Sequence, residues 1–316
     1  MYRNNEANDD VIEFQLYRPE TLTRWQRFRK AMYNPSSRQI LGRTPKQWGQ
    51  LALFYSVFYL LLVIMFLVCM QVLFSSLDPR IPTWILDKSL IGDNPGLGYR
   101  PMPIAKRVGT TIQYNLNDQD SINHWVDVLD EFLVPYKDNQ SKYNFVNCDF
   151  DNFPGEGDVC TFTMDTATVG NCVKDKKYGY TTTSPCVFLK LNRIFSWIPE
   201  YYSQALDEMP DDLQEHIKSL KTQRERHQVW VTCKELGKGD GSHLKGFTYS
   251  PRGFPQYYYP YRNYQNYLSP IVAVEILELE SNISVRIECR AWARNIRYHG
   301  GVNREGSVAF EIQVDL

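Results

Sequence analysis

Residues 51–74 read LALFYSVFYLLLVIMFLVCMQVLF, and the charge-free run around them extends over residues 48–77. As an α-helix rising 1.5 Å per residue, a 24-residue segment is about 36 Å long, which is enough to cross a hydrocarbon core of about 30 Å with some tilt. The buried helix of a soluble protein is rarely apolar on every face over this length. Hydropathy therefore predicts a membrane-spanning helix, and this helix divides the rest of the chain.

The flanking charges predict the orientation of the span. Between Arg24 and Lys46 there are seven basic residues and no acidic one, whereas residues 78–88 carry two of each sign. The positive-inside rule then places the N-terminus in the cytosol. The apolar run starts too late and is too long for a cleaved signal peptide, so the sequence predicts a signal-anchored, single-pass type II membrane protein.

The cysteines are unevenly distributed. Cys69 lies inside the apolar run, and six others follow it: Cys148, Cys160, Cys172, Cys186, Cys233 and Cys289. An even number on one side of a membrane favours disulfides in an oxidising compartment. A zinc site is the alternative, but no CxxC or HxxxH spacing accompanies these cysteines. The two sequons, at Asn139 and Asn282, also follow the span and are candidate glycosylation sites of an extracellular or lumenal domain.

These signals predict four regions. They are a cytosolic tail (1–48), a transmembrane helix (49–76), an extended, proline-containing connector (77–105) and a disulfide-bonded ectodomain (106–316). In the tail, residues 21–33 place Trp25, Phe28 and Met32 on one helical face among basic residues. This pattern suits a short helix against anionic lipid headgroups, and a basic topology signal without fixed structure is the alternative.

The ectodomain pattern is mainly that of strands. One amphipathic helix is predicted at 121–135, and residues 284–293 and 308–316 alternate apolar and polar side chains, as does VWVTCKE at 229–235. Such alternation indicates antiparallel sheet with one wetted face. Cys233 and Cys289 lie on the inward faces of two such strands, where a bridge could join two packed sheets. The predicted fold is an immunoglobulin-like β-sandwich with helical insertions.

The sequence offers little catalytic chemistry. Its histidines belong to no nucleophile or metal motif, and GKGDGSHLKG (237–246) lacks the strand-loop-helix context of a phosphate-binding loop. Asp149-Phe150-Asp151 is the pattern by which Golgi glycosyltransferases hold a metal-bound nucleotide sugar, but the alternating strands and helices of a nucleotide-binding sheet are missing. No metal, cofactor or enzymatic activity is predicted, and a net charge of −1 gives no reason to expect nucleic acid.

Aromatic residues are abundant instead. QYYYPYRNYQNYLSP (256–270) has six tyrosines within residues 257–267. Tyrosine is enriched at interfaces, and a tyrosine ladder over the domain's own sheet is the alternative. In the span, Tyr55, Phe58 and Tyr59 share a helical face, and a hydroxyl as deep as that of Tyr59 favours a neighbouring helix. Both features suggest a partner protein.

Taken together, these residues resemble the β subunit family of the X⁺/K⁺-ATPases (Na,K-ATPase and H,K-ATPase), and in particular an invertebrate-like Na,K-ATPase β subunit. The resemblance covers nearly the whole chain in order. It is carried by YNPSSRQILGRTPKQWG (33–49), LFYSVFY (53–59), GLGYRPMP (96–103), PCVFLKLNRIFSW (185–197), VWVTC (229–233) and YYYPY (257–261).

The resemblance implies a non-catalytic, glycosylated subunit that the catalytic α subunit of a cation pump needs for folding, assembly and delivery to the plasma membrane, and that modulates K⁺ affinity. It implies the bridges Cys148–Cys160, Cys172–Cys186 and Cys233–Cys289. It also implies contact with α through Tyr55, Phe58 and Tyr59 in the span and through Tyr258, Tyr259, Pro260 and Tyr261 in the ectodomain. A small single-span regulatory subunit and the lipid bilayer are further expected partners.

One departure from the family is notable. Members often carry glycines after the FY motif, whereas residues 60–70 read LLLVIMFLVCM here, so a small-residue face for close helix packing is missing. Two other classes of function stay open at this point: a cell-adhesion or junction protein of the same family that acts without the pump, and the type II Golgi glycosyltransferase.

Overall fold

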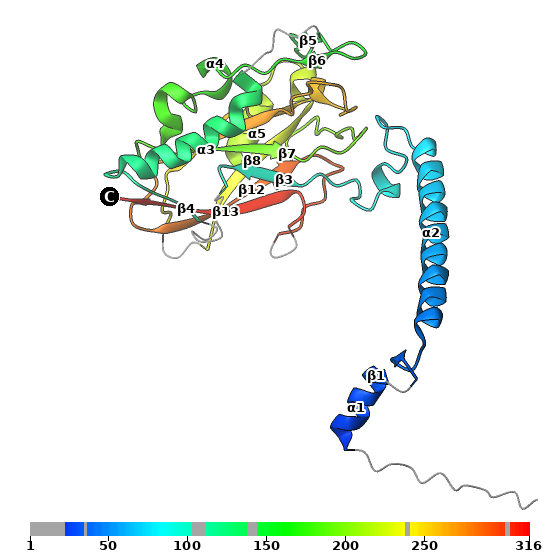
Figure 1. Ribbon diagram of the computed structural model, residues 1–316. Coiled ribbons are helices and arrows are strands. Elements are labelled where there is room, and N and C mark those ends of the chain that lie inside the picture. The colour runs from blue at the N-terminus through cyan, green and yellow to red at the C-terminus, as the bar shows by residue number, and fades with distance from the viewer. Residues whose placement is uncertain (1–22, 35–36, 103–110, 138–143, 238–240, 301–303) are drawn as a thin grey trace, which may run out of the picture. The chain divides into compact units, whose positions relative to one another are not determined.

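The computed structural model describes residues 23–34, 37–102, 111–137, 144–237, 241–300 and 304–316. The chain divides into two compact units, Met1–Leu77 and Asp78–Leu316, whose elements are labelled in Figure 1. The boundary between the units falls directly after the apolar run.

In its described residues, the N-terminal unit has two helices joined by a small hairpin. Helix α1 (Arg24–Met32) is followed by β1 (Tyr33–Asn34), β2 (Gln39–Ile40) and helix α2 (Pro45–Ser76). Proline at the first turn of α2 and the Thr44/Gln47 capping box both favour a helix start at this point. The α2 helix has 32 residues and none of them is buried, so it has the length and composition of a membrane span and not the burial of a soluble core helix.

The C-terminal unit is built on two β-sheets. The first has the strand order β10-β8-β12-β13-β4, and the second β3-β7-β11-β9. In the first sheet the strands are β10 (Gly253–Pro255), β8 (Gln228–Leu236), β12 (Ser284–Trp292), β13 (Ser307–Asp315) and β4 (Thr111–Asn115). In the second they are β3 (Leu97–Arg100), β7 (Cys186–Leu191), β11 (Ile271–Leu277) and β9 (Gly246–Ser250). Neighbours are antiparallel except β13 and β4, which run parallel. A separate parallel pair joins β5 (Phe145–Val146) to β6 (Val159–Cys160).

The two sheets pack face to face, as the alternation predicted. In β12, Val285 and Ile287 are buried while Arg286 between them is exposed. Across the core, the ring of Tyr99 in β3 stacks on Phe310 in β13 with centroids 4.8 Å apart. Inward side chains of both sheets form one hydrophobic cluster, which confirms the predicted mainly-β sandwich.

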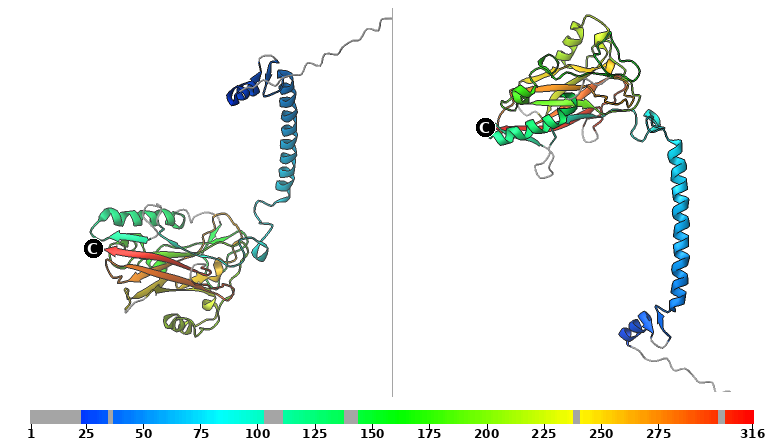
Figure 2. Two further views of the ribbon diagram at one scale, coloured as in Figure 1. Left: turned by 90° about the horizontal axis from the view of Figure 1, so that it is seen from below. Right: turned by 45° about the horizontal axis from the view of Figure 1, so that its top comes forward.

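Helices cover the outside of the sandwich. They are α3 (Gln119–Lys137), α4 (Thr166–Val169) and α5 (Asp211–Ser219), with 3₁₀ turns at Leu86–Lys88, Lys174–Gly179, Arg224–Arg226 and Gln256–Tyr258. Helix α3 includes the predicted 121–135 segment and buries its apolar face. Helix α5 packs Leu213 and Ile217 against Trp230 and Trp292 in a second cluster. Figure 2 shows α3 and α5 on opposite sides of the sandwich.

Two expectations need correction. The Cys233–Cys289 bridge does not join two packed sheets: β8 and β12 are neighbours in one sheet, with these two residues directly paired. Alternation shows which side chains point inward but not which strand lies next to which. The connector is also shorter than 77–105, because β3 starts at Leu97 and buries Leu97 and Tyr99 in the sandwich core.

Candidate interaction surface

The tyrosine-rich segment leaves β10 and lies against the edge of the sandwich. Tyr258 is 7% exposed, and its hydroxyl donates a hydrogen bond to the carbonyl oxygen of Thr161 at 2.7 Å. The hydroxyl of Tyr267 donates to the carbonyl oxygen of Tyr258 at 3.0 Å. Part of the aromatic surface is therefore buried by packing within the domain. Tyr258 supports the segment from beneath and has little exposed surface with which to contact a partner.

Tyr259 is positioned by Trp197, whose ring it meets edge to face at 5.7 Å. Its hydroxyl oxygen is buried and has no hydrogen-bond partner among the described residues. Burial raises the pKa of Tyr259 well above its ordinary value, so the group stays a neutral hydrogen-bond donor. An unpaired buried hydroxyl is costly, and other atoms of Tyr259 contribute to the lining of a cavity.

Arg193 holds the next part of the segment. Its guanidinium carbon lies 5.4 Å from the ring centroid of Tyr261 and 5.2 Å from that of Tyr267, and its Nε donates to Ser269 Oγ at 2.8 Å. Such cation–π contacts restrain both rings. The backbone N–H of Ser196 donates to the carbonyl oxygen of Tyr261 at 2.8 Å, so residues 193–196 and the tyrosine segment form one ordered surface.

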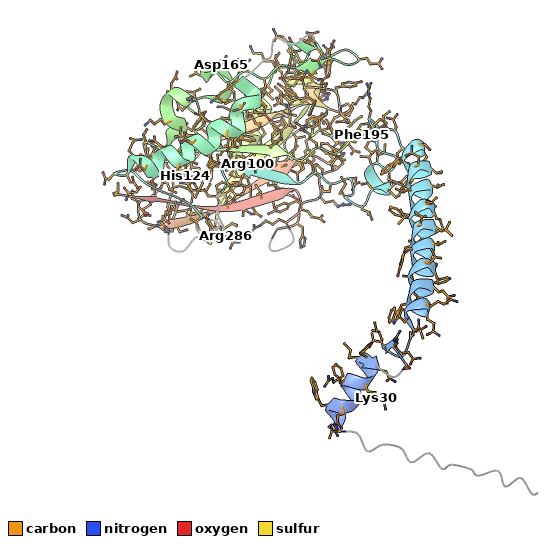
Figure 3. The ribbon with its side chains drawn as sticks, in the orientation of Figure 1. Lys30, Arg100, His124, Asp165, Phe195 and Arg286 are labelled. Carbon is orange, nitrogen blue, oxygen red and sulfur yellow. A yellow bond between two sulfur atoms is a disulfide. The ribbon has the colours of Figure 1, made fainter. Side chains whose placement is uncertain are left out.

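Two adjoining cavities open on this surface, and we call them together the tyrosine groove. The first has a volume of about 320 Å³ and lies between residues 153–160 and the tyrosines. The second, about 750 Å³, adds Arg80, Ile81 and Ile85 from the connector to Phe195 and the 262–265 loop. Both are lined by Glu156, Arg262 and Tyr264. Asn263 Nδ2 donates to the carbonyl oxygen of Arg80 at 3.3 Å. Phe195, labelled in Figure 3, lies at the end of the domain where the connector enters.

The groove has the chemistry of a binding surface. Aromatic rings with one unpaired hydroxyl are bordered by charges of both signs, which is typical of a protein–protein contact. Within the described ranges, no group of three or more His, Cys, Asp or Glu is arranged to hold a metal ion. Asp149 Oδ1 accepts from the N–H groups of Asp151 and Asn152, and Asp151 forms an ion pair with Arg224. The Asp-Phe-Asp tripeptide thus builds a turn.

The cysteines and the sequons complete the set of predicted sites. Bridges join Cys148 to Cys160, Cys172 to Cys186 and Cys233 to Cys289, the pairs that the resemblance implies. Asn282 is exposed, with its backbone N–H donating to the carbonyl oxygen of Val314. Asn139 lies outside the described residues.

The predicted face of the span carries a compact aromatic set. The rings of Tyr55 and Tyr59 stack with centroids 6.1 Å apart, and Phe58 meets Tyr59 edge to face at 5.4 Å. All three side chains are exposed, Tyr59 at 58%. Because these side chains are exposed, the face presents aromatic rings to the surroundings of the helix.

Some groove residues escaped sequence reasoning. Glu156 and the connector residues near Arg80 carry no motif, and tertiary folding brings them from distant parts of the chain to Arg262 of the tyrosine-rich segment. Phe195 had a signal, because it lies in the quoted segment PCVFLKLNRIFSW.

The chain was compared with known proteins. Residues 18–310 match the family model described as the sodium/potassium ATPase beta chain. The chain is 42% identical to sodium/potassium-transporting ATPase subunit beta-1 of Drosophila melanogaster over 96% of both chains. It is 40% identical to the beta-2 subunit of the same fly over 98% of this chain and 99% of that one. It is 29% identical to the human beta-2 subunit over 94% of this chain and 96% of that one. With an apolar helix ahead of a disulfide-bonded β-sandwich and a match over nearly its full length, this chain belongs to the beta-chain family of the sodium/potassium ATPases.

Proposed function

We propose that this chain is a non-catalytic β subunit that assembles with the catalytic α subunit of a Na⁺/K⁺-transporting P-type ATPase. The observation that carries the proposal is the tyrosine groove, an ordered aromatic surface with an unpaired buried hydroxyl and charged borders. Tyr259 and Pro260 line it, Tyr261 lies beside it against Arg193, and Tyr258 supports them from beneath. In the span, Tyr55, Phe58 and Tyr59 form the second contact.

Assembly is the proposed mechanism. The subunit covers surface on α, so the complex folds and travels to the plasma membrane with the N-terminus cytosolic and the sandwich outside the cell. Glycans on Asn139 and Asn282 belong to that outer domain. If the groove binds one conformation of α more tightly than another, it shifts the conformational equilibrium and with it the affinity for K⁺. ATP hydrolysis and ion ligation are assigned to α, and a small regulatory subunit is a further proposed partner.

The test uses two exposed arginines of the C-terminal domain. Arg262 borders the groove, whereas Arg286, on β12, lies well away from Phe195 (Figure 3). Full-length Arg262→Glu and Arg286→Glu variants are expressed with a Na,K-ATPase α subunit. We measure the amount of α that copurifies and the amount that reaches the cell surface.

Arg262→Glu is expected to lower both quantities, because it reverses a charge at the proposed contact, while Arg286→Glu leaves them at the wild-type level. Equal effects of the two reversals would contradict the assignment of the groove. Normal surface delivery of the chain without any α would favour the adhesion alternative, which no present observation supports.

A further inference from the structure

Helix α1 presents an exposed apolar stripe. Trp25, Phe28 and Met32 are 73%, 56% and 48% exposed, and the rings of Trp25 and Phe28 stack with centroids 5.7 Å apart. At 100° per residue the three positions fall within an arc of about 60°. A stripe of this kind on a nine-residue helix has no protein core to enter within the described part of its unit.

Basic residues border the stripe. Arg24 and Arg29 lie at its two edges on the same helical projection, and residues 24–46 contain seven basic residues and no acidic one. An apolar stripe between cationic edges matches the boundary between acyl chains and anionic headgroups, where rings enter the interface and guanidinium groups meet phosphate or carboxylate.

The hairpin ties α1 to the start of the span. The backbone N–H of Leu41 donates to the carbonyl oxygen of Met32 at 3.1 Å, and Trp48 Nε1 donates to the carbonyl oxygen of Ile40 at 2.8 Å. Leu41 is four residues before Pro45, the first residue of α2, a distance of at most about 14 Å along an extended chain. The end of α1 is therefore held close to the chain's entry into the membrane.

The hairpin enlarges the apolar surface. Tyr33, Ile40 and Leu41 are 52%, 46% and 55% exposed. Trp48 lies near the start of the charge-free run, at the level where tryptophan is enriched in membrane proteins. The exposed apolar groups, the cationic edges and the tether to the span all point to a lipid surface.

We propose that α1 and the β1–β2 hairpin form a membrane-surface anchor that binds the anionic lipid headgroups of the leaflet at which α2 begins. The anchor goes beyond the proposed pump assembly and needs only that α2 spans a bilayer. It fixes the depth of the N-terminal end of α2 in the bilayer and the rotation of α2 about its own axis. The rotation sets the direction in which the aromatic face of α2 points.

The experiment uses the full-length chain in lipid nanodiscs. In a Cys69→Ser background, a Phe28→Cys variant carries an environment-sensitive fluorophore, and quenching by headgroup-level quencher lipids reports its depth. Nanodiscs of phosphatidylcholine alone are compared with nanodiscs that also contain phosphatidylserine. Because each bilayer is symmetric, the measurement does not depend on the orientation of the chain or on an α subunit.

Quenching is expected to rise strongly when phosphatidylserine is present and to fall with added salt. An Arg24→Gln/Arg29→Gln variant is expected to lower the ratio of bound to free helix by about 30-fold, since each basic residue near an anionic surface contributes a factor of about five. Arg286→Gln/Arg294→Gln removes the same charge from the C-terminal domain and is expected to change nothing.

Equal quenching with and without phosphatidylserine, or none in either, would overturn the proposal. So would a fluorophore that becomes shielded only when a catalytic subunit is copurified, because a protein and not lipid would then cover the stripe. Loss of α binding in the groove variants leaves the anchor standing, so the two proposals fail separately.

Discussion

The α2 helix and the strands of the sandwich are both rich in apolar side chains, but these side chains are exposed in the helix and buried in the strands. None of the 32 residues of α2 is buried, whereas five of the six residues of β7 are. The sandwich covers its apolar surface with its own second sheet. The described residues provide no such cover for the helix, so its stability is set by its surroundings and that of the sandwich by its own sequence.

This contrast predicts that substitutions in one region leave the other unchanged. The largest effect is expected from Cys233→Ala/Cys289→Ala. The bridge closes a separation of 56 residues, and its loss lowers the free energy of unfolding of the C-terminal domain by about 4 kcal/mol on the loop-closure model. Denaturant unfolding without reductant measures the loss, and membrane insertion of α2 stays as in the wild type.

The Cys148–Cys160 bridge, which closes a shorter loop, allows the size of that loss in stability to be compared with a second bridge. It spans 12 residues, and its removal is expected to cost about 3 kcal/mol. If the domain unfolds at the wild-type denaturant concentration when either bridge is missing, the predicted stabilisation by the bridges is wrong. If the span no longer inserts, the stability of the span depends on that of the sandwich, which would contradict the comparison.

A charge in the middle of the span is the complementary change. Leu62 lies near the centre of the charge-free run and is exposed. Leu62→Arg is expected to raise the free energy of membrane insertion by about 3 kcal/mol, measured as the fraction of chains that become glycosylated on the far side. The unfolding midpoint of the chains that do insert is expected to stay unchanged. Unimpaired insertion would show that α2 does not lie in hydrocarbon.

Asp130 tests the internal stability of the sandwich unit through pH. Burial alone would raise the pKa of its carboxyl, but hydrogen bonds from Lys137, Lys174 and Tyr178 outweigh it and lower the pKa to about 2. The donors Lys137 Nζ and Tyr178 OH each lie 2.6 Å from Asp130 Oδ1. This cluster joins α3 to the 174–179 turn.

Because the pKa is lowered on folding, the carboxylate stabilises the domain above its ordinary pKa of 3.8, and the stabilisation is lost as the pH falls towards about 2. Asp130→Asn is expected to lower the free energy of unfolding by about 1–2 kcal/mol at neutral pH, and the difference from wild type shrinks over that acid range. Glu131→Gln, on an exposed position of the same helix, serves as the control. A difference that does not change with pH would contradict the ion-pair explanation.

The smallest effects come from one substitution made in both regions. Tyr59→Phe removes an exposed hydroxyl in the span and is expected to weaken association with α by about 0.6 kcal/mol without changing the sandwich. Tyr258→Phe removes a partly buried hydrogen bond to Thr161 and is expected to lower the free energy of unfolding by about 1 kcal/mol. Copurification under graded detergent measures the first and denaturant unfolding the second. The comparison would be contradicted if both variants weakened the association with α, or if both lowered the free energy of unfolding of the sandwich.

The contrast also explains what the sequence reveals. Hydropathy and periodicity act over neighbouring residues, so the span, α3 and the strand faces could all be predicted. Strand neighbours could not: alternation puts Cys233 and Cys289 inward, but whether they face each other across two sheets or within one is decided by long-range pairing. Leu97 and Tyr99 looked like part of a proline-containing connector because β3 is short and lies close to it.

The tyrosine groove shows the same limit. The tyrosines are visible as a cluster in the sequence, but the burial of each one is not: Tyr258 is almost fully buried, while Tyr264 stays partly exposed. Glu156, Phe195 and Arg80 join them only through the folded chain. A composition signal thus predicted a binding segment, and the fold decides which of its side chains remain available.

The most direct measurement places a photo-crosslinking amino acid at position 264 of the full-length chain in native membranes, with position 286 as the control. Tyr264 lines both cavities of the groove, and Arg286 is exposed on β12. We predict a crosslink from position 264 to an extracellular segment of the catalytic α subunit and none from position 286. Crosslinks to α in equal yield from both positions, or to other proteins alone from position 264, would contradict the assignment of the groove as the subunit interface.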